Sequence, residues 1–280
     1  MYRVFVFGTV LALLVAPSVT ASAQPAQAAL VSTAWLQQHL DDAQVRVIFV
    51  GERNAYDRGH IPGARVLDHM QTLGSDHALE APGSLAAVLA KAGAGDSARV
   101  ILYGDDPMST GWVFMAFASI GHGHDVSLLD GAFDLWKTEG RPVANTASPE
   151  GKDHLTVRPA PDVAVDAAWV RSHLQSPDVR VLDVRTSQEW DAGHLPGATL
   201  ILWQDLFADR KTQKFKSPDE MRSLFERAGV RPGQQIVTYC AVGMRASLMY
   251  WAAQVAGLPA RVYVGSFNNW RQDSSNPIAK

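Results

Sequence analysis

The segment VRVLDVRTSQEWDAGHLPGA at residues 179–198 is matched, at an offset of 134 residues, by VRVIFVGERNAYDRGHIPGA at residues 45–64. Each copy opens with a run of β-branched and apolar residues, which is typical of a buried strand. Each closes on Gly-His, one apolar residue and Pro-Gly-Ala, which is typical of a turn. A strand and a turn that recur in one register indicate an internal duplication.

Further matches extend the duplication over both halves of the chain. After an insertion of two residues the offset becomes 136, and near the end it returns to 134. We therefore predict two domains, at residues 30–145 and 164–280. The segment between them, residues 146–163, is rich in Pro, Ser and charge and is predicted to be a linker. The further aligned pairs are VSTAWLQQHL (31–40) with VDAAWVRSHL (165–174), SLAAVLAKAG (84–93) with EMRSLFERAG (220–229), VILYG (100–104) with IVTYC (236–240), and DGAFDLW (130–136) with VGSFNNW (264–270).

Strand patterns alternate with helical patterns inside each copy. In the second copy QQIVTY at residues 234–239 is typical of a buried strand, while residues 218–229 and 245–257 are typical of helices that end at Gly. Strands that alternate with helices need crossover connections, which give a mostly parallel sheet with helices on both faces. The predicted fold class is α/β, with two tandem domains of this kind.

The charge balance excludes one class of partner. The 280 residues carry 25 Lys plus Arg against 28 Asp plus Glu, and no basic run interrupts this balance. Binding to nucleic acid needs a row of cations that neutralises phosphates. We therefore expect no nucleic-acid partner.

The N-terminal residues predict export. Arg3 precedes an uncharged apolar run at residues 4–15, and Ala-Ser-Ala follows at residues 21–23. This is the pattern of a secretory signal peptide, predicted at residues 1–23, with a second possible cleavage site after Ala28. A membrane anchor is the alternative, but the run is shorter than the roughly 20 residues that a span needs. We expect a periplasmic or secreted protein without stable membrane insertion after cleavage.

Cys240 is the single cysteine, so no internal disulfide can form. It follows the apolar run IVTY and so should lie at the carboxyl end of a strand, where open α/β sheets hold their ligands. A short loop that leads from there into a helix points successive N–H groups inward and forms an anion-binding nest. Gly243 lets this loop bend, and Arg245 adds a positive charge beside the sulfur. The pattern predicts a reactive thiolate rather than an inert buried thiol.

Three segments resemble the rhodanese family in order and spacing: LDVRTSQEWDAGHLPGA (182–198), YCAVGMRAS (239–247) and VGSFNNW (264–270). The resemblance covers almost the whole chain after the signal peptide. It implies that Cys240 takes the outer sulfur of a small anionic donor such as thiosulfate, holds it as a persulfide and passes it to cyanide or a thiol. It requires no metal and no organic cofactor. The predicted substrate-binding residues are Arg245, Arg185, Ala241, Val242, Gly243 and Met244.

Two alternatives to thiosulfate sulfurtransferase activity stay open. Family members that act on 3-mercaptopyruvate usually have Gly-Ser-Gly-Val-Thr after the cysteine, whereas this chain has Ala-Val-Gly-Met-Arg. Glu189 stands where larger animal members carry a substrate-binding arginine. The other alternative is a non-enzymatic persulfide or oxyanion carrier. Related dual-specificity phosphatases are excluded, because five residues separate their Cys from Arg and only four separate Cys240 from Arg245.

The N-terminal copy is predicted to be catalytically inactive, since it lacks the residues of this chemistry. We expect it to serve as a scaffold and as one wall of the catalytic cleft. The replacements are Gly104 for Cys240, Phe49 for Asp183 and Gly51 for Arg185.

The remaining polar candidates favour structural roles. Asp183 is predicted to form an ion pair or a loop cap, whereas Arg185 either approaches the cleft or bonds to carboxylates and carbonyls. His60 and His194 recur in both copies, which favours a role in the turn.

Two further pairs of residues give expectations about burial. Trp136 and Trp270 close equivalent segments, which indicates core packing. His122 and His124 are expected to face solvent rather than to bind a metal, because no further ligands lie near them in the sequence.

Overall fold

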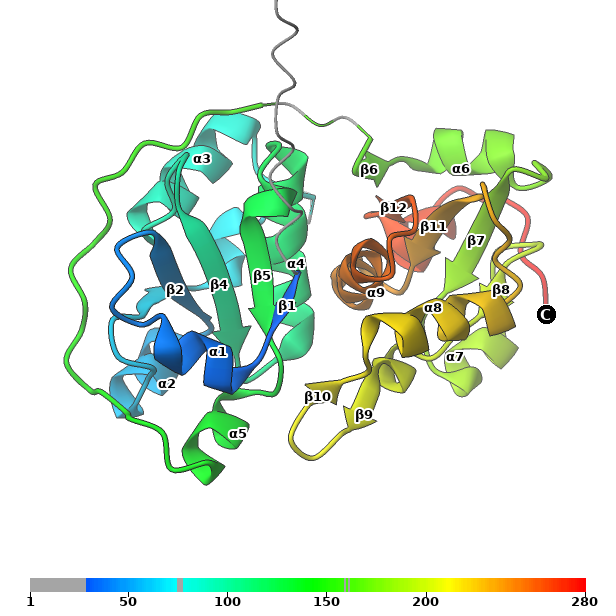
Figure 1. Cartoon of the computed structure of the whole chain (residues 1–280). Coiled ribbons are helices and arrows are strands. Elements are labelled where there is room, and N and C mark those ends of the chain that lie inside the picture. Colours follow the sequence, from blue (N-terminus) through cyan, green and yellow to red (C-terminus); the bar gives the residue numbers. More distant parts are fainter. Residues whose placement is uncertain (1–28, 75–77, 159, 161) are drawn as a thin grey trace, which may run out of the picture.

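The computed structural model describes residues 29–74, 78–158, 160 and 162–280, so the predicted signal peptide at residues 1–23 lies outside the described residues. The described chain forms two α/β domains that repeat one order of elements (Figure 1). No helix or strand lies between Thr138 and Ala164 among the described residues of that interval.

The N-terminal domain is built on a five-stranded sheet in the order β1-β5-β4-β2-β3, and every pair of neighbours is parallel. Both faces of the sheet are buried, as a parallel sheet requires. The strands are β1 (Leu30–Val31), β2 (Val45–Val50), β3 (Arg65–Leu67), β4 (Arg99–Gly104) and β5 (Val126–Leu129). The helices are α1 (Thr33–Gln38), α2 (Arg53–Arg58), α3 (Pro82–Lys91), α4 (Pro107–Ser119) and α5 (Phe133–Thr138), with 3-10 turns η1 (His69–Thr72) and η2 (Gly123–Asp125).

The C-terminal domain repeats this plan, with the order β6-β12-β11-β7-β8 and parallel neighbours throughout. It adds an antiparallel hairpin of β9 and β10. The strands are β6 (Ala164–Val165), β7 (Val179–Asp183), β8 (Thr199–Leu200), β9 (Phe207–Asp209), β10 (Lys214–Phe215), β11 (Gln235–Tyr239) and β12 (Ala260–Tyr263). The helices are α6 (Ala167–His173), α7 (Ser187–Ala192), α8 (Pro218–Arg227), α9 (Met244–Val255) and α10 (Ser266–Trp270), with the 3-10 turn η3 (Trp203–Leu206).

Alternate residues of the central strands point to opposite faces and bury different helices. Along β2, Phe49 packs with α1, α2 and α5 on the outer face, whereas Ile48 and Val50 pack with α3 and α4 on the inner face. In the second domain α6 and α10 cover the outer face, and α8 and α9 cover the inner one. The predicted α/β class with helices on both faces is confirmed.

The two domains share one hydrophobic core across their interface, where α4 and α9 pack together (Figure 1). The approach is so close that a Cβ on Gly111 would lie 2.6 Å from the Cα of Leu248. Across the same contact the Ser247 Oγ lies 3.4 Å from the sulfur of Met115. The N-terminal domain therefore packs directly against the helix that follows Cys240.

Within the described residues, no helix has both the length and the hydropathy of a membrane span.

Candidate active site

Cys240 lies directly after β11, the central strand of the second sheet, and before α9. Because β11 lies between β7 and β12, the carboxyl ends of three parallel strands surround this point. Cys240 is 1% exposed, so its thiol forms the floor of the loop rather than its rim. This is the position that the strand pattern predicts.

The loop from Cys240 to Arg245 folds around the sulfur. The Cys240 Sγ accepts a hydrogen bond from the backbone N–H of Gly243 at 3.1 Å. Gly243 has a φ of +92°, and a Cβ there would lie 2.8 Å from the Val264 carbonyl oxygen and 3.2 Å from the ring of Trp112. Both the conformation and the space therefore demand glycine. Trp112 belongs to α4, so the N-terminal domain forms a wall behind this loop.

The start of α9 leaves backbone donors at the loop. No side chain caps its first turn, and the first N–H groups of a helix have no acceptor within it. Met244 begins the helix, Val242 is 47% exposed at the rim, and the Ala241 carbonyl accepts from the N–H of Asn268 at 3.1 Å. A helix start without a capping side chain can bind an anion through these N–H groups. Contact of Ala241, Val242, Gly243 and Met244 with a substrate stays a prediction.

Ser266 fixes the backbone of Cys240, a role that was not predicted from the sequence. The Cys240 N–H donates to the Ser266 Oγ at 3.1 Å, and the Ser266 hydroxyl donates to the Tyr263 carbonyl at 2.9 Å. Ser266 has a φ of +54°, a conformation that non-glycine residues rarely adopt, so its contacts hold it there. The signal was present in the repeat, where Ala132 stands in the place of Ser266.

Arg245 lies beside the sulfur, but a carboxylate holds its guanidinium. Its Nη1 and Nη2 donate to the two carboxylate oxygens of Glu189 at 2.7 and 2.8 Å. This bond is the main cause that lowers the pKa of Glu189 to about 2, and it also raises the pKa of Arg245, with a further contribution from Cys240. Glu189 additionally caps α7 by accepting from the Thr186 N–H and hydroxyl. The positive charge that we predicted at Arg245 is therefore present, but it is paired with the carboxylate of Glu189.

Arg185 is buried, with 3% exposure, and it forms an ion pair with Asp183. Its Nη2 lies 2.6 Å from the Asp183 carboxylate and 2.7 Å from the Gly193 carbonyl oxygen, and the guanidinium lies 4.2 Å from the centre of the Phe267 ring. Asp183 also accepts from the Tyr239 hydroxyl at 2.6 Å. These bonds confirm the ion pair predicted for Asp183. Direct contact of Arg185 with a substrate stays a prediction.

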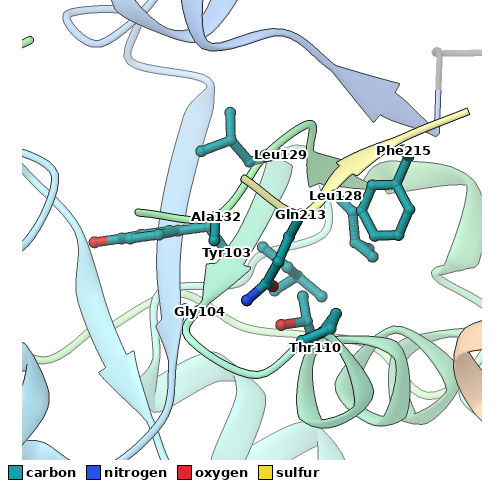
Figure 2. Close-up of a pocket in the computed structure, with 11 residues that line it drawn as sticks. Tyr103, Gly104, Thr110, Leu128, Leu129, Ala132, Gln213 and Phe215 are labelled. Atoms are coloured by element: carbon teal, nitrogen blue, oxygen red, sulfur yellow. The ribbon is translucent and has the colours of Figure 1, made fainter. Parts of the chain in front are cut away.

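The equivalent place in the N-terminal domain has no room for a cysteine. Gly104 ends β4 as Cys240 follows β11, and it lines a cavity of only ≈ 20 Å³, about enough for one water (Figure 2). A Cβ on Gly104 would lie 2.3 Å from the Val50 carbonyl oxygen. The absence of a sulfur here is therefore built into the backbone.

The β9–β10 hairpin of the C-terminal domain closes this cavity. Figure 2 shows the Gln213 side chain directed into it, and the Gln213 amide donates to the Asp105 carbonyl at 3.1 Å. The Ala132 N–H donates to the Thr212 carbonyl at 3.1 Å, and the Phe215 N–H donates to the Asp130 carboxylate at 2.8 Å. The hairpin of the other domain therefore covers part of the N-terminal counterpart of the Cys240 site.

The tryptophans and histidines singled out in the sequence are mostly buried. Trp136 and Trp270 are fully buried, which confirms core packing. The expectation that His122 faces solvent is wrong: it is 1% exposed, and its Nε2 lies 2.8 Å from the Thr156 carbonyl oxygen, because the linker packs over it. The His194 ring stacks on the Trp190 ring, which supports the role in the turn that we predicted for it.

In the described part of the chain no group of three or more His, Cys, Asp or Glu could hold a metal ion.

The fold and the loop define a class of two-domain α/β protein in which one domain presents a buried cysteine to an uncapped helix N-terminus. The chain belongs to the rhodanese family, because the family model of the rhodanese-like domain matches residues 32–139 and again residues 166–273. It is a rhodanese-type sulfurtransferase or sulfur carrier.

Three curated relatives illustrate this division. The chain is 31% identical over 280 residues to "Sulfur carrier protein TtuD" of Thermus thermophilus, covering 90% of this chain and 96% of the relative. It is 28% identical to "Probable 3-mercaptopyruvate sulfurtransferase" of Pseudomonas aeruginosa, covering 80% of this chain and 85% of the relative. It is 26% identical to "Thiosulfate sulfurtransferase" of Azotobacter vinelandii, covering 89% and 96%.

Proposed function

We propose that the protein is a thiosulfate sulfurtransferase that carries sulfur on Cys240 as a persulfide. The observation that supports this best is the geometry of Cys240, whose Sγ already accepts a hydrogen bond from the Gly243 N–H at the start of α9. A ring of four residues between Cys240 and Arg245 is a small cradle, suited to one extra sulfur atom.

The reaction divides into two displacements. The Cys240 thiolate attacks the outer sulfur of thiosulfate, the sulfur–sulfur bond of the donor breaks, and sulfite leaves with the bonding electron pair. The resulting persulfide anion is stabilised by the N–H groups of the loop, which were preorganised before the charge arrived. Cyanide or a thiolate then attacks the outer sulfur, and Cys240 returns to the thiolate.

In this proposal Arg245 and the backbone of Ala241, Val242, Gly243 and Met244 bind the anionic end of the donor. The proposal also assigns Arg185 to substrate binding, because it follows β7 at the same carboxyl edge of the sheet as Cys240. Its ion pair with Asp183 fixes the end of that strand. The proposal needs no metal and no organic cofactor, because the electrons and the leaving group come from the donor itself.

Two other functions have support of their own. Transfer from 3-mercaptopyruvate is favoured by the relative from Pseudomonas aeruginosa, and a non-enzymatic persulfide carrier is favoured by TtuD. Against the first stands the loop sequence Ala-Val-Gly-Met-Arg, and against the second stands the open helix N-terminus beside the sulfur.

Steady-state assays distinguish these functions. The mature protein is given thiosulfate or 3-mercaptopyruvate with cyanide as the common acceptor, and thiocyanate is measured. We expect a higher kcat/KM for thiosulfate. A higher kcat/KM for 3-mercaptopyruvate would assign the runner-up donor, and a single stoichiometric transfer without turnover would assign the carrier.

We further propose that the protein is exported and acts in the periplasm or outside the cell. The proposal rests on the charge and apolar run before Ala23. N-terminal sequencing of exported material should begin near Gln24. Protein that retains Met1 and stays in the membrane would contradict export.

A further inference from the structure

A groove of ≈ 880 Å³ is lined by residues of the catalytic loop and of the edge strand β6. We call it the β6 groove. Val242 of the loop, Ala164 and Asp166 next to or in β6, and Asn268 and Gln272 in or after α10 all line it. Leu79 of the N-terminal domain lines it from the opposite side. The groove is thus shared by both domains and reaches the rim above the sulfur.

The size of the groove does not match a small acceptor. Sites that enclose a drug-sized ligand measure roughly 300–1,000 Å³, so this groove has room for a molecule of that size. Cyanide has two atoms and thiosulfate has five, and neither would contact more than a small part of the wall. The groove therefore has room for a molecule much larger than cyanide or thiosulfate.

The charge of the groove points away from an anion. Among the residues that the structure describes, its lining contains no Lys, Arg or His, and its ionisable side chains are the carboxylate of Asp166 and the phenol of Tyr263. This carboxylate accepts from the Trp169 N–H at 2.8 Å and caps α6. A dianionic donor would meet no cation among these described lining residues, which therefore suit an uncharged or weakly cationic molecule.

The polar groups of the groove are those that recognise peptide backbone. β6 is the edge of its sheet and pairs with β12 on one side. The Val262 N–H donates to the Val163 carbonyl at 2.8 Å, so by the alternation of a parallel ladder the N–H and C=O of exposed Ala164 face away from β12. Such an edge accepts an added strand. Among the described residues, the side-chain amides of Asn268 and Gln272 also have no hydrogen-bond partner.

We propose that the β6 groove binds the sulfur acceptor as an extended, uncharged peptide segment that carries a cysteine. This inference rests on the proposed function and names the acceptor class. The peptide pairs with the outer edge of β6 while its cysteine reaches the loop past Val242. Its thiolate attacks the outer sulfur of the Cys240 persulfide, the bond between the two sulfurs of the persulfide breaks, and the peptide leaves as a persulfide while Cys240 keeps the electron pair as thiolate.

The experiment measures discharge of the preformed Cys240 persulfide in single-turnover reactions. The acceptors are cyanide, free N-acetylcysteine amide, and an acetylated and amidated hexapeptide of Ala and Ser with one central Cys. In the wild type we expect the hexapeptide to react at least about 5-fold faster than N-acetylcysteine amide, the gain of one or two hydrogen bonds.

Two variants test the groove itself. Ala164→Pro removes the outward N–H of the edge strand without removing a bond to β12, and Gln272→Glu replaces a donor amide by a carboxylate. Each should slow the hexapeptide roughly 2- to 10-fold and leave cyanide unchanged. The matched control is Gln254→Glu, an exposed residue of α9 outside the groove, which should change neither rate.

Three outcomes would overturn the inference. The hexapeptide and N-acetylcysteine amide would react at equal rates in the wild type, or the groove variants would leave the hexapeptide rate unchanged, or they would slow cyanide as much as the peptide. Failure to form a persulfide with any donor would overturn the proposed function, and it is seen before any acceptor is added.

Discussion

Helices α4 and α9 begin at equivalent places in the two domains, yet their first turns are completed in opposite ways. At α4 the Asp106 carboxylate accepts from the N–H groups of Met108 and Ser109, each at 3.1 Å. At α9 the residue before the helix is Gly243, which has no side chain to offer. A carboxylate at a helix N-terminus occupies the place of a bound anion. A side chain of the protein thus occupies the start of α4, whereas no side chain caps the start of α9.

The space beside Gly104 is also much smaller than the space beside the Cys240 loop. The β9–β10 hairpin leaves ≈ 20 Å³ beside Gly104, whereas the matching segment of the N-terminal domain, bridged from Leu73 to Leu79, borders a groove of ≈ 880 Å³. The domains therefore cover each other's sites unequally. The N-terminal domain thus differs from the C-terminal domain in the cysteine, the helix cap, the backbone and the covering segment together, which supports the prediction that it is inactive.

The largest effect is expected from removing the sulfur. Cys240→Ser should lower turnover with thiosulfate and cyanide by on the order of 10⁴-fold or more, because the hydroxyl is too weak a nucleophile to form the intermediate. The fold should be unchanged, since the two side chains are nearly equal in size. Thiocyanate release and thermal unfolding are measured side by side. Residual turnover near the wild-type level would remove Cys240 from the mechanism.

The second effect concerns the shared cation. Arg245→Ala removes a charge-assisted contact of about 1.5–3 kcal/mol and leaves Glu189 unpaired beside the sulfur, so kcat/KM for thiosulfate should fall roughly 10- to 150-fold. Arg245→Lys should lower it less, because it keeps the charge and loses the planar fork of donors.

A control separates binding from folding at this position. The rate of Cys240 alkylation against pH and the thermal unfolding midpoint are measured for wild type and both Arg245 variants. An unchanged alkylation profile with a large loss of thermal stability would make Arg245 a structural residue, and the anion nest would then rest on backbone groups alone.

The third effect tests whether the N-terminal site can be reopened. Gly104→Cys in the Cys240→Ser background should restore no sulfur transfer and should destabilise the protein by about 1–3 kcal/mol, because the new Cβ would lie 2.3 Å from the Val50 carbonyl oxygen. Urea unfolding measures the loss. Gly83→Cys is the control, since nothing lies within 4 Å of a Cβ there. Turnover in the Gly104 variant would show that the cysteine alone separates the domains.

The smallest effect concerns the carboxylate that shares the cation. Glu189→Gln should release the charge of Arg245 and lower KM for thiosulfate about 2- to 5-fold with little change in kcat, the scale of one ion pair that solvent partly screens. An unchanged KM would show that the pair does not restrain donor binding.

The same variant should change the acid stability. The pKa of Glu189 is lowered to about 2 from 4.5, chiefly by the bond from Arg245. A depressed pKa contributes stability that is present above pH 4.5 and is lost as the pH falls through about 2. The difference in unfolding midpoint between wild type and Glu189→Gln should therefore shrink in that window. A constant difference would contradict the ion pair.

The repeat in the sequence was enough to predict the parallel α/β domains and the place of Cys240, because strand and helix patterns are local and the offset aligned them. The pair of Arg245 with Glu189 could not be predicted, since it joins α9 to α7 across 56 residues of chain. The burial of His122 was predicted wrongly, because nothing local shows that the linker folds back over it. The closure beside Gly104 depends on the other domain.

We propose that Cys240 alone carries the sulfur, and the intact mass of the protein after treatment with thiosulfate is the decisive measurement. The mature wild-type protein should gain one sulfur atom, which peptide mapping places on Cys240 and which cyanide removes, while Cys240→Ser should gain none. If treated wild-type protein gained no mass, or if Cys240→Ser also gained one sulfur atom, Cys240 would not be the sulfur carrier.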